Sequence, residues 1–164
     1  MAEIRRPPYL PPVLLFACLA LMGLLHFLLP LGRWLESPLT WAGLLPLGVG
    51  LGLLLGAALL FPKHGTTIKP FEESTALLTE GPYRYSRNPI YLGMILVLVG
   101  VAVLLGTRTP LLAIPLFFVL ITNQFIVNEE AMLEERFGPL GNERYRRCFG
   151  EAYREYRQRV RRWL

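Results

Sequence analysis

Apolar residues run through four long uncharged stretches that short polar segments separate. A helix needs about 20 such residues to cross the hydrocarbon core of a bilayer. The predicted spans are residues 13–31, 41–61, 90–105 and 111–127. Residues 106–110 make a compact turn, so the last two spans are expected to form a helical hairpin. The pattern predicts an all-α polytopic membrane protein that folds as a single domain over residues 1–164.

The composition supports a membrane protein and excludes several other classes. Hydrophobic residues make up 53% of the chain and charged residues 18%, and the mean hydropathy is +0.41. These values argue against a soluble or disordered chain. Cys18 and Cys148 form no CxxC or Cys/His pattern, so a disulfide framework or zinc site is not indicated. All 12 acidic residues are Glu, which excludes Ser-His-Asp triads and EF-hand loops.

The basic residues predict the orientation in the membrane. The amino terminus, the loop over residues 62–89 and the tail after Val127 lie on one side of a four-span chain. Together they hold 15 of the 17 Lys and Arg residues, whereas the other side has only Arg33 and Arg108. The net charge of +5 therefore follows membrane topology rather than nucleic-acid binding. By the positive-inside rule, both termini and the central loop are cytoplasmic, in a plasma, inner or endoplasmic reticulum membrane.

Small and polar residues mark special positions in the first two spans. Gly48, Gly52 and Gly56 recur every four residues and predict a ridge on which another helix packs closely. His26 is the one ionisable side chain well inside a predicted span. Its position is compatible with a functional group or with a neutral histidine bonded to a neighbouring helix.

The segment after the fourth span predicts a helix with one apolar stripe. The stripe consists of Tyr145, Phe149, Ala152, Tyr156, Val160 and Trp163. Such a helix either lies at the membrane interface as an anchor or closes over a site at the ends of the spans. The pattern alone leaves both alternatives open.

Polar residues gather where the fourth span meets the cytoplasm. Asn123 and Gln124 are expected to bond to a neighbouring helix. Asn128, Glu129 and Glu130 follow directly. The carboxylates either mark the membrane boundary or hold a ligand, because a carboxylate pair binds a cation or accepts hydrogen bonds from a ribose.

The central loop ends in the sequence GPYRYSRNPIYLG, residues 81–93. Pro89 suits the first turn of the third span, and Asn88 is the expected N-cap. Three tyrosines, two arginines and free backbone amides at a helix start are able to hold an anion and to stack on a flat ring. These residues predict a small polar or aromatic ligand at the cytoplasmic face.

Two spaced motifs resemble the isoprenylcysteine carboxyl methyltransferase family and the wider group of small membrane methyltransferases that includes the phospholipid N-methyltransferases. The first motif is residues 81–93, with Asn88 at the family's His/Asn position. The second comprises Glu129, Glu130, Leu133, Phe137 and Gly138, followed by the FGEAYREY stretch of residues 149–156. The resemblance covers about residues 62–162. Residues 139–150 look like an insertion of 12 residues relative to the family.

The resemblance implies that S-adenosylmethionine binds in the half of the chain over residues 62–164, without a Rossmann fold. It implies catalytic roles for Arg87 and Glu130. The cofactor-binding residues implied are Gly81, Tyr83, Arg87, Asn88, Pro89, Tyr91, Gly93, Glu129, Glu130, Tyr153 and Tyr156. No metal is implied. The lipophilic acceptor is expected to enter sideways from the bilayer.

The acceptor stays open among a prenylated cysteine carboxylate, a phospholipid amine, a small thiol and other amphiphiles. An amine acceptor must first lose a proton, for which Glu130 or a tyrosine is a candidate. Three other functions compete: a four-helix small-molecule transporter, a non-catalytic membrane scaffold and a nicotinamide-dependent reductase. The oligomeric state is not readable from the sequence.

Overall fold

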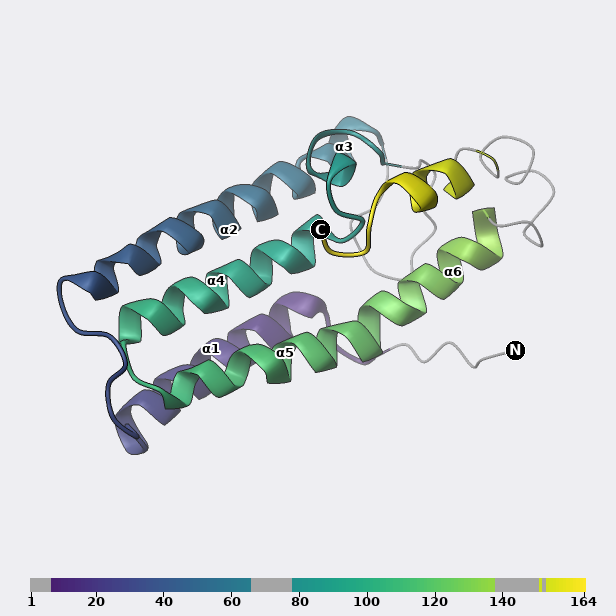
Figure 1. Cartoon of the computed structure of the whole chain (residues 1–164). Coiled ribbons are helices and arrows are strands. Elements are labelled where there is room, and N and C mark those ends of the chain that lie inside the picture. Colours follow the sequence, from purple (N-terminus) through teal and green to yellow (C-terminus); the bar gives the residue numbers. More distant parts are fainter. Residues whose placement is uncertain (1–6, 66–77, 138–150, 152) are drawn as a thin grey trace.

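The computed structural model describes residues 7–65, 78–137, 151 and 153–164, and these residues form helices joined by short turns (Figure 1). The α-helices are α1 (Pro11–Leu28), α2 (Leu44–Ala58), α3 (Leu60–Lys63), α4 (Pro89–Leu105), α5 (Ala113–Ile121) and α6 (Val127–Phe137). Three 3₁₀ turns, η1 (Leu39–Gly43), η2 (Gly81–Arg84) and η3 (Thr109–Leu112), and one π turn, η4 (Thr122–Ile126), connect or extend them. Residues 153–159 are also helical. The prediction of an all-helical chain is confirmed for the described residues.

Three helical segments of the described chain are long and apolar enough to cross a bilayer: Pro11–Leu28, Leu39–Lys63 and Thr109–Met132. The third predicted span forms α4, which is apolar but has 17 residues, so the count of four spans stays a prediction. The last predicted span, residues 111–127, is too short at both ends. It extends because η3, α5, η4 and α6 follow one another as a continuous rod.

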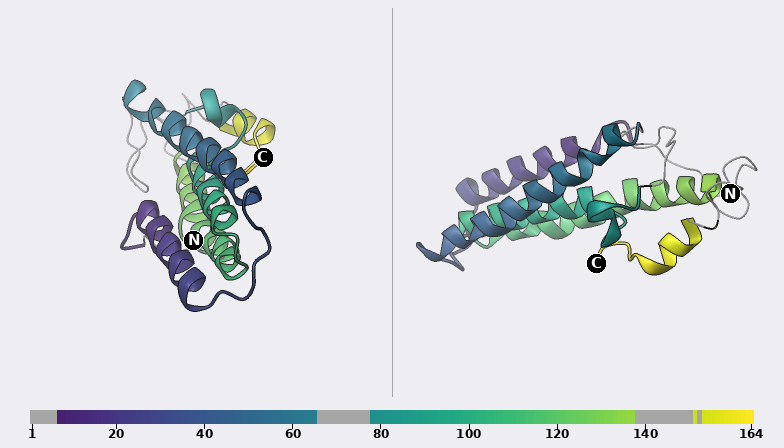
Figure 2. Two further views of the ribbon diagram at one scale, coloured as in Figure 1. Left: turned by 90° about the vertical axis from the view of Figure 1, so that its left-hand side faces the viewer. Right: turned by 90° about the horizontal axis from the view of Figure 1, so that it is seen from above.

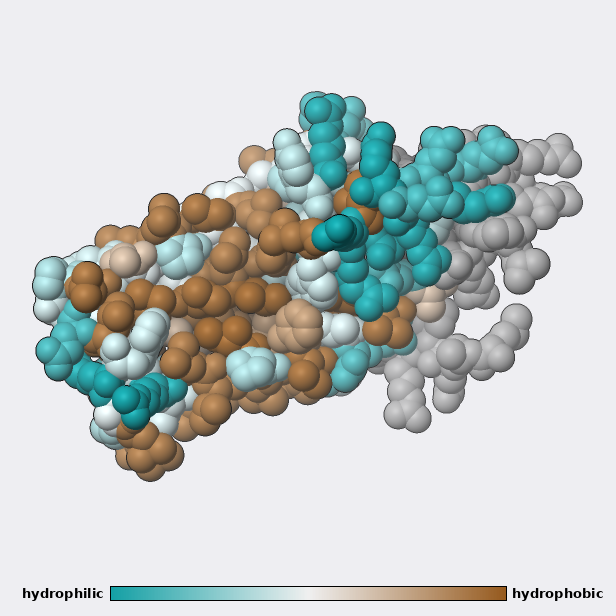
Figure 3. Space-filling model, viewed as in Figure 1, coloured by the Kyte–Doolittle hydropathy of each residue, from teal (hydrophilic) through white to brown (hydrophobic). Residues whose placement is uncertain are grey.

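The helices pack in a bundle in which α2 lies along α4, and α1 lies beside α5 (Figures 1 and 2). The side chains at its centre are almost fully buried, among them Met22, Leu98, Phe117 and Phe125. The outer faces carry many exposed leucine, valine and phenylalanine side chains, which give the bundle its apolar surface (Figure 3). The larger hydrophilic area lies where α6 and the C-terminal segment lie, and a smaller one lies at the opposite end of the bundle. The chain is thus an integral membrane protein with a polar end.

The predicted glycine ridge is wrong, because different glycines form the close helix contact. A Cβ atom at Gly48 or Gly52 would meet nothing within 4 Å. A Cβ atom at Gly50 would lie 2.7 Å from the carbonyl oxygen of Gly93, and one at Gly100 would lie 2.6 Å from the backbone nitrogen of Leu47. The backbones of α2 and α4 therefore approach at Gly50 of α2 and at Gly93 and Gly100 of α4, which the four-residue spacing did not reveal.

His26 bonds to a neighbouring turn at the end of the bundle opposite α6. Its Nδ1 atom lies 2.9 Å from the hydroxyl of Thr107, and Thr107 pairs with Arg33 in an isolated antiparallel bridge. Gly106 ends α4 with a positive φ of 65° and accepts a hydrogen bond from the backbone N–H of Trp34. Of the two alternatives for His26, the structure supports the bonded one, in which it joins the α1 end to the α4–α5 turn.

Candidate functional site

The candidate site lies where the start of α4 meets α6 and the C-terminal segment. Asn88 is the N-cap residue of α4, as predicted, but its side chain forms no capping hydrogen bond. The Asn88 side-chain amide donates instead to the carbonyl oxygen of Arg162 at 3.1 Å, and its backbone N–H donates to the Ser86 hydroxyl at 3.1 Å. The Asn88 side chain therefore bonds to a segment that is distant in the sequence, which no local pattern could reveal.

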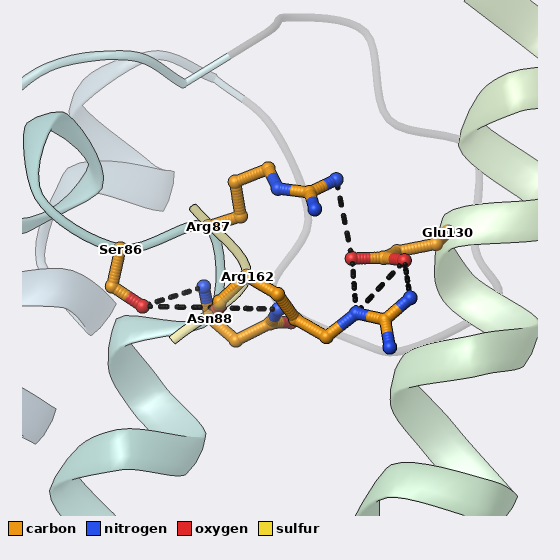
Figure 4. Close-up of polar contacts among 5 residues, drawn as sticks. All are labelled: Ser86, Arg87, Asn88, Glu130 and Arg162. Atoms are coloured by element: carbon orange, nitrogen blue, oxygen red, sulfur yellow. Dashed lines mark hydrogen bonds and ion pairs between the residues drawn. The ribbon is translucent and has the colours of Figure 1, made fainter. Parts of the chain in front are cut away.

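The last five residues form a strap, residues 160–164, that is fixed to the start of α4. The backbone N–H of Arg87 donates to the carbonyl oxygen of Arg161 at 3.0 Å. The Ser86 hydroxyl donates to the carbonyl oxygen of Arg162 at 3.3 Å, and Val160 is buried. The strap therefore holds the three residues that precede Pro89 through backbone and side-chain bonds (Figure 4).

Two guanidinium groups reach across from the strap and from the start of α4 to one carboxylate of α6 (Figure 4). The Arg162 Nη2 atom lies 2.6 Å from Glu130 Oε2, and its Nε atom lies 3.1 Å from Oε1. The Arg87 Nη1 atom lies 3.2 Å from Glu130 Oε1. The hydrogen bonds to Glu130 raise the pKa of Arg162. Together, Arg87, Glu130 and Arg162 form an ionic cluster with one positive charge in excess.

Arg87 is incompletely bonded in this cluster. Its side chain is 15% exposed, and its Nε and Nη1 atoms are buried without a hydrogen-bond acceptor, since the contact with Glu130 is poorly aligned for a hydrogen bond. Such donors are rare in folded proteins and cost free energy. Arg87 thus retains donor capacity that the described residues leave unused.

The neighbouring carboxylate has a different partner. The hydroxyl of Tyr91 donates to Glu129 Oε1 at 2.8 Å. Tyr91 is buried on α4, and its ring lies 6.5 Å from that of Phe125. Both carboxylates are half-buried and bonded to groups from other elements, which is compatible with the membrane boundary and with a ligand site.

The helix over residues 153–159 covers the loop before α4. The hydroxyl of Tyr156 donates to the backbone carbonyl of Tyr83 at 2.9 Å, and Tyr153 and Tyr156 are both buried. Burial raises the pKa of Tyr156 to about 12, although nearby Arg87 opposes the shift. Burial also raises the pKa of Tyr83. Both phenols are therefore neutral hydrogen-bond donors at physiological pH.

The structure brings together most of the site residues predicted from the sequence. Two of them lie elsewhere: Gly93 faces Gly50 of α2, and Gly81 begins η2 against the side chain of Leu60. The structure adds Ser86 and Arg162, which the sequence analysis did not single out. Ser86 lies within the first motif, but Arg162 stands in a run of arginines without any distinguishing pattern. The Phe137 side chain, Gly138, the apparent insertion and the stripe residues 145, 149 and 152 lie outside the described residues.

The fold and site define a class: a helical membrane protein with a partly buried ionic cluster at one end of its bundle. The chain belongs to the phospholipid methyltransferase family, whose model matches residues 39–139, and through it to the isoprenylcysteine carboxyl methyltransferase-like group. The match includes α2, Arg87 before α4, Glu130 of α6 and the hairpin between them. The resemblance stated from the two motifs is thereby confirmed, and it favours a membrane methyltransferase acting on lipids over a transporter, a scaffold or a reductase.

One relative of the chain carries no functional description. It is an uncharacterised protein of Haemophilus influenzae that is 37% identical over 76 residues, which are 46% of this chain and the whole of that protein. No solved structure matches the chain.

Proposed function

We propose that the protein transfers a methyl group from S-adenosylmethionine to a lipophilic acceptor in the membrane. The observation that carries this proposal is the ionic cluster at the start of α4, with its buried and unsatisfied Arg87 donors. Family membership supports the reaction class. The catalytic subtype, cofactor and acceptor are part of the proposal.

The residues present fit the chemical groups of S-adenosylmethionine. The unsatisfied N–H groups of Arg87 suit its carboxylate, since guanidinium groups bind carboxylates with charge-assisted bonds. The carboxylates of Glu129 and Glu130 suit its ammonium group or ribose hydroxyls. Tyr83 and Tyr156, already joined by a hydrogen bond, supply aromatic surface for the adenine.

When bound, S-adenosylmethionine supplies a methyl carbon whose bond to sulfur breaks, with the electron pair going to sulfur, as the bond to the acceptor forms. The protein has to hold the acceptor in line with that bond and to exclude water. The strap and the helix over residues 153–159 serve this purpose because they cover the start of α4.

An amine acceptor needs a residue that takes its proton. Glu130 is already paired with two guanidinium groups, whereas the described partner of Glu129 is the neutral hydroxyl of Tyr91. We therefore assign charge binding to Glu130 and proton acceptance to Glu129. This revises the expectation from the sequence, which gave the proton-accepting role to Glu130 or a tyrosine.

The first test is binding of S-adenosylmethionine to the detergent-purified protein by calorimetry, with NADPH as the control ligand. The expected result is saturable binding in the micromolar range for S-adenosylmethionine alone. Arg87→Gln should weaken it at least about tenfold, whereas Arg84→Gln, at an exposed position nearby, should not. Absence of binding by a folded sample, or unchanged binding by Arg87→Gln, contradicts the proposal.

We infer the orientation from the basic residues, with the site and both termini in the cytoplasm and α4 as a fourth span. Single cysteines at Arg33 and Arg84, in a chain with Cys18 and Cys148 replaced by serine, test this. A membrane-impermeant maleimide should label only the Arg33→Cys variant from the outside of intact cells. The reverse labelling pattern contradicts the orientation.

A further inference from the structure

The strap contacts the rod of α5, η4 and α6 at two places. Its residue Arg162 contacts Glu130, and the next residue, Trp163, stacks on Phe118 with ring centroids 5.0 Å apart. Phe118 and Glu130 are 12 positions apart on one continuous rod, roughly 18 Å at 1.5 Å per residue. Two adjacent side chains of the strap therefore contact this rod on either side of η4.

This stretch contains an unsatisfied hydroxyl. Thr122, one turn after Phe118, begins η4, and its Oγ1 atom is buried without a hydrogen-bond partner. A helical threonine ordinarily bonds to a carbonyl of the preceding turn. The side-chain atoms buried without a hydrogen-bond partner in the described chain are this hydroxyl and the Arg87 Nε and Nη1 groups. Single π turns occur frequently at functional sites.

The stack of Trp163 on Phe118 is the apolar part of the same surface. Phe118 is 41% exposed although Trp163 covers one face of its ring, so it also faces outward from the bundle. Trp163 is half-buried and packs against the core that α1, α4 and α5 share. A mainly hydrophilic segment thus inserts one large apolar side chain among the membrane helices, beside the ionic cluster.

We propose that the strap occupies the acceptor site: a membrane phospholipid enters from the bilayer by parting Trp163 from Phe118. One acyl chain of the lipid takes the place of the Trp163 ring, and a head-group or ester oxygen bonds to the Thr122 hydroxyl. This places the acceptor next to Glu129 and Glu130. The inference rests on the proposed function and adds to it the acceptor's path and the residues that determine its binding.

The test tethers the strap and measures methyl transfer and cofactor binding separately. Phe118→Cys and Trp163→Cys are combined in a chain with Cys18→Ser and Cys148→Ser, and a reducible bifunctional thiol reagent joins them. The protein is reconstituted in vesicles of phosphatidylethanolamine and phosphatidylglycerol with S-adenosylmethionine tritiated in the methyl group. Tethering should reduce the tritium in extracted lipid at least tenfold and should leave the affinity for S-adenosylmethionine within about twofold. Cleavage of the tether by reductant should restore methyl transfer.

A matched control uses Leu116→Cys with Trp163→Cys. Leu116 is exposed two positions before Phe118, about 200° around the helix, so the same reagent should leave transfer unchanged. Continued transfer by the tethered Phe118 protein overturns the inference. Loss of cofactor binding on tethering also overturns it, because the strap would then admit the cofactor rather than the lipid.

The unmodified protein separates failure of the inference from failure of the proposed function. Cofactor binding without label in lipid overturns the phospholipid acceptor alone, whereas absence of cofactor binding overturns the proposed function and the inference with it. Thr122→Val should raise the KM for lipid about 3- to 10-fold with unchanged cofactor affinity, and Thr122→Ser should restore it. An unchanged KM for lipid in Thr122→Val would show that the Thr122 hydroxyl does not bind the acceptor.

Discussion

The guanidinium group of Arg162 contacts the carboxylate of Glu130 at 2.6 Å, although the two residues are 32 positions apart in the sequence. Arg87 contacts the same carboxylate from a third part of the chain. This single carboxylate therefore holds α6, the start of α4 and the C-terminal strap together. It links the stability of the polar end of the bundle to the chemistry proposed there.

Glu130→Gln should destabilise the polar end because it leaves two guanidinium groups close together without a counter-charge. The Glu130 side chain is 14% exposed but that of Arg162 is 41% exposed, so solvent screens part of the loss. We expect a free-energy loss of about 1–3 kcal/mol, measured by thermal unfolding in detergent. Glu36→Gln, at an exposed position in the loop between α1 and η1, is the control and should change little. Equal stability of the two variants would show that the ionic cluster contributes nothing.

Gly50→Ala and Gly48→Ala should have opposite effects on stability. The new methyl group at Gly50 would lie 2.7–2.8 Å from backbone atoms of Gly93 and Val97, which cannot move without separating α2 from α4. At Gly48 the methyl group meets nothing, and alanine favours a helix by up to about 1 kcal/mol. Melting temperatures of the two variants in the same detergent check the prediction. A lower melting temperature for Gly48→Ala but not for Gly50→Ala would contradict this and support the helix-packing ridge expected from the sequence.

Tyr156→Phe should cost about 1 kcal/mol because the carbonyl of Tyr83 loses its donor. The pKa of Tyr156 is raised to about 12, so the stabilisation is fully present below the ordinary tyrosine value near 10 and is lost as pH rises through about 12. The stability difference from the unmodified protein should therefore be constant from pH 7 to pH 9. Tyr85→Phe, at a 75% exposed position, is the control. A difference that already shrinks within that pH range would contradict the raised pKa.

Thr107→Val should weaken the opposite end of the bundle. It removes the hydroxyl that lies 2.9 Å from His26 Nδ1, at a position that is 3% exposed. We expect a loss of about 1 kcal/mol in thermal unfolding and no change in S-adenosylmethionine binding, because the site lies at the other end. Thr107→Ser keeps the hydroxyl and should preserve most of the stability. Weaker cofactor binding in Thr107→Val would give His26 a role beyond packing.

The sequence predicted the apolar helices because each is defined by a local property, a long run of uncharged residues. It also predicted the polar end and most of its residues, since Arg87, Tyr91, Glu129 and Glu130 stand in two compact motifs. The family resemblance drawn from these motifs is confirmed. The site roles given to individual residues stay predictions.

The glycine contact between α2 and α4 could not be predicted in the same way. Gly50 and Gly93 meet because two helices cross at one register, and glycine spacing within one helix does not define that register. Gly48 and Gly52 form the more regular pattern but face away from the partner helix. Which face of an almost uniformly apolar helix is buried depends on its neighbours.

By itself, the sequence determined that this chain is a helical membrane protein with a methyltransferase-like motif pair at one end. Only the tertiary structure decided that the strap closes this end, that Arg162 shares Glu130 with Arg87, and that the side chain of the N-cap residue Asn88 bonds to the strap. The physical reason is the range of the interactions. Apolar runs and motifs depend on neighbouring residues, whereas the contacts of Ser86 and Asn88 with Arg162 join positions 76 and 74 residues apart.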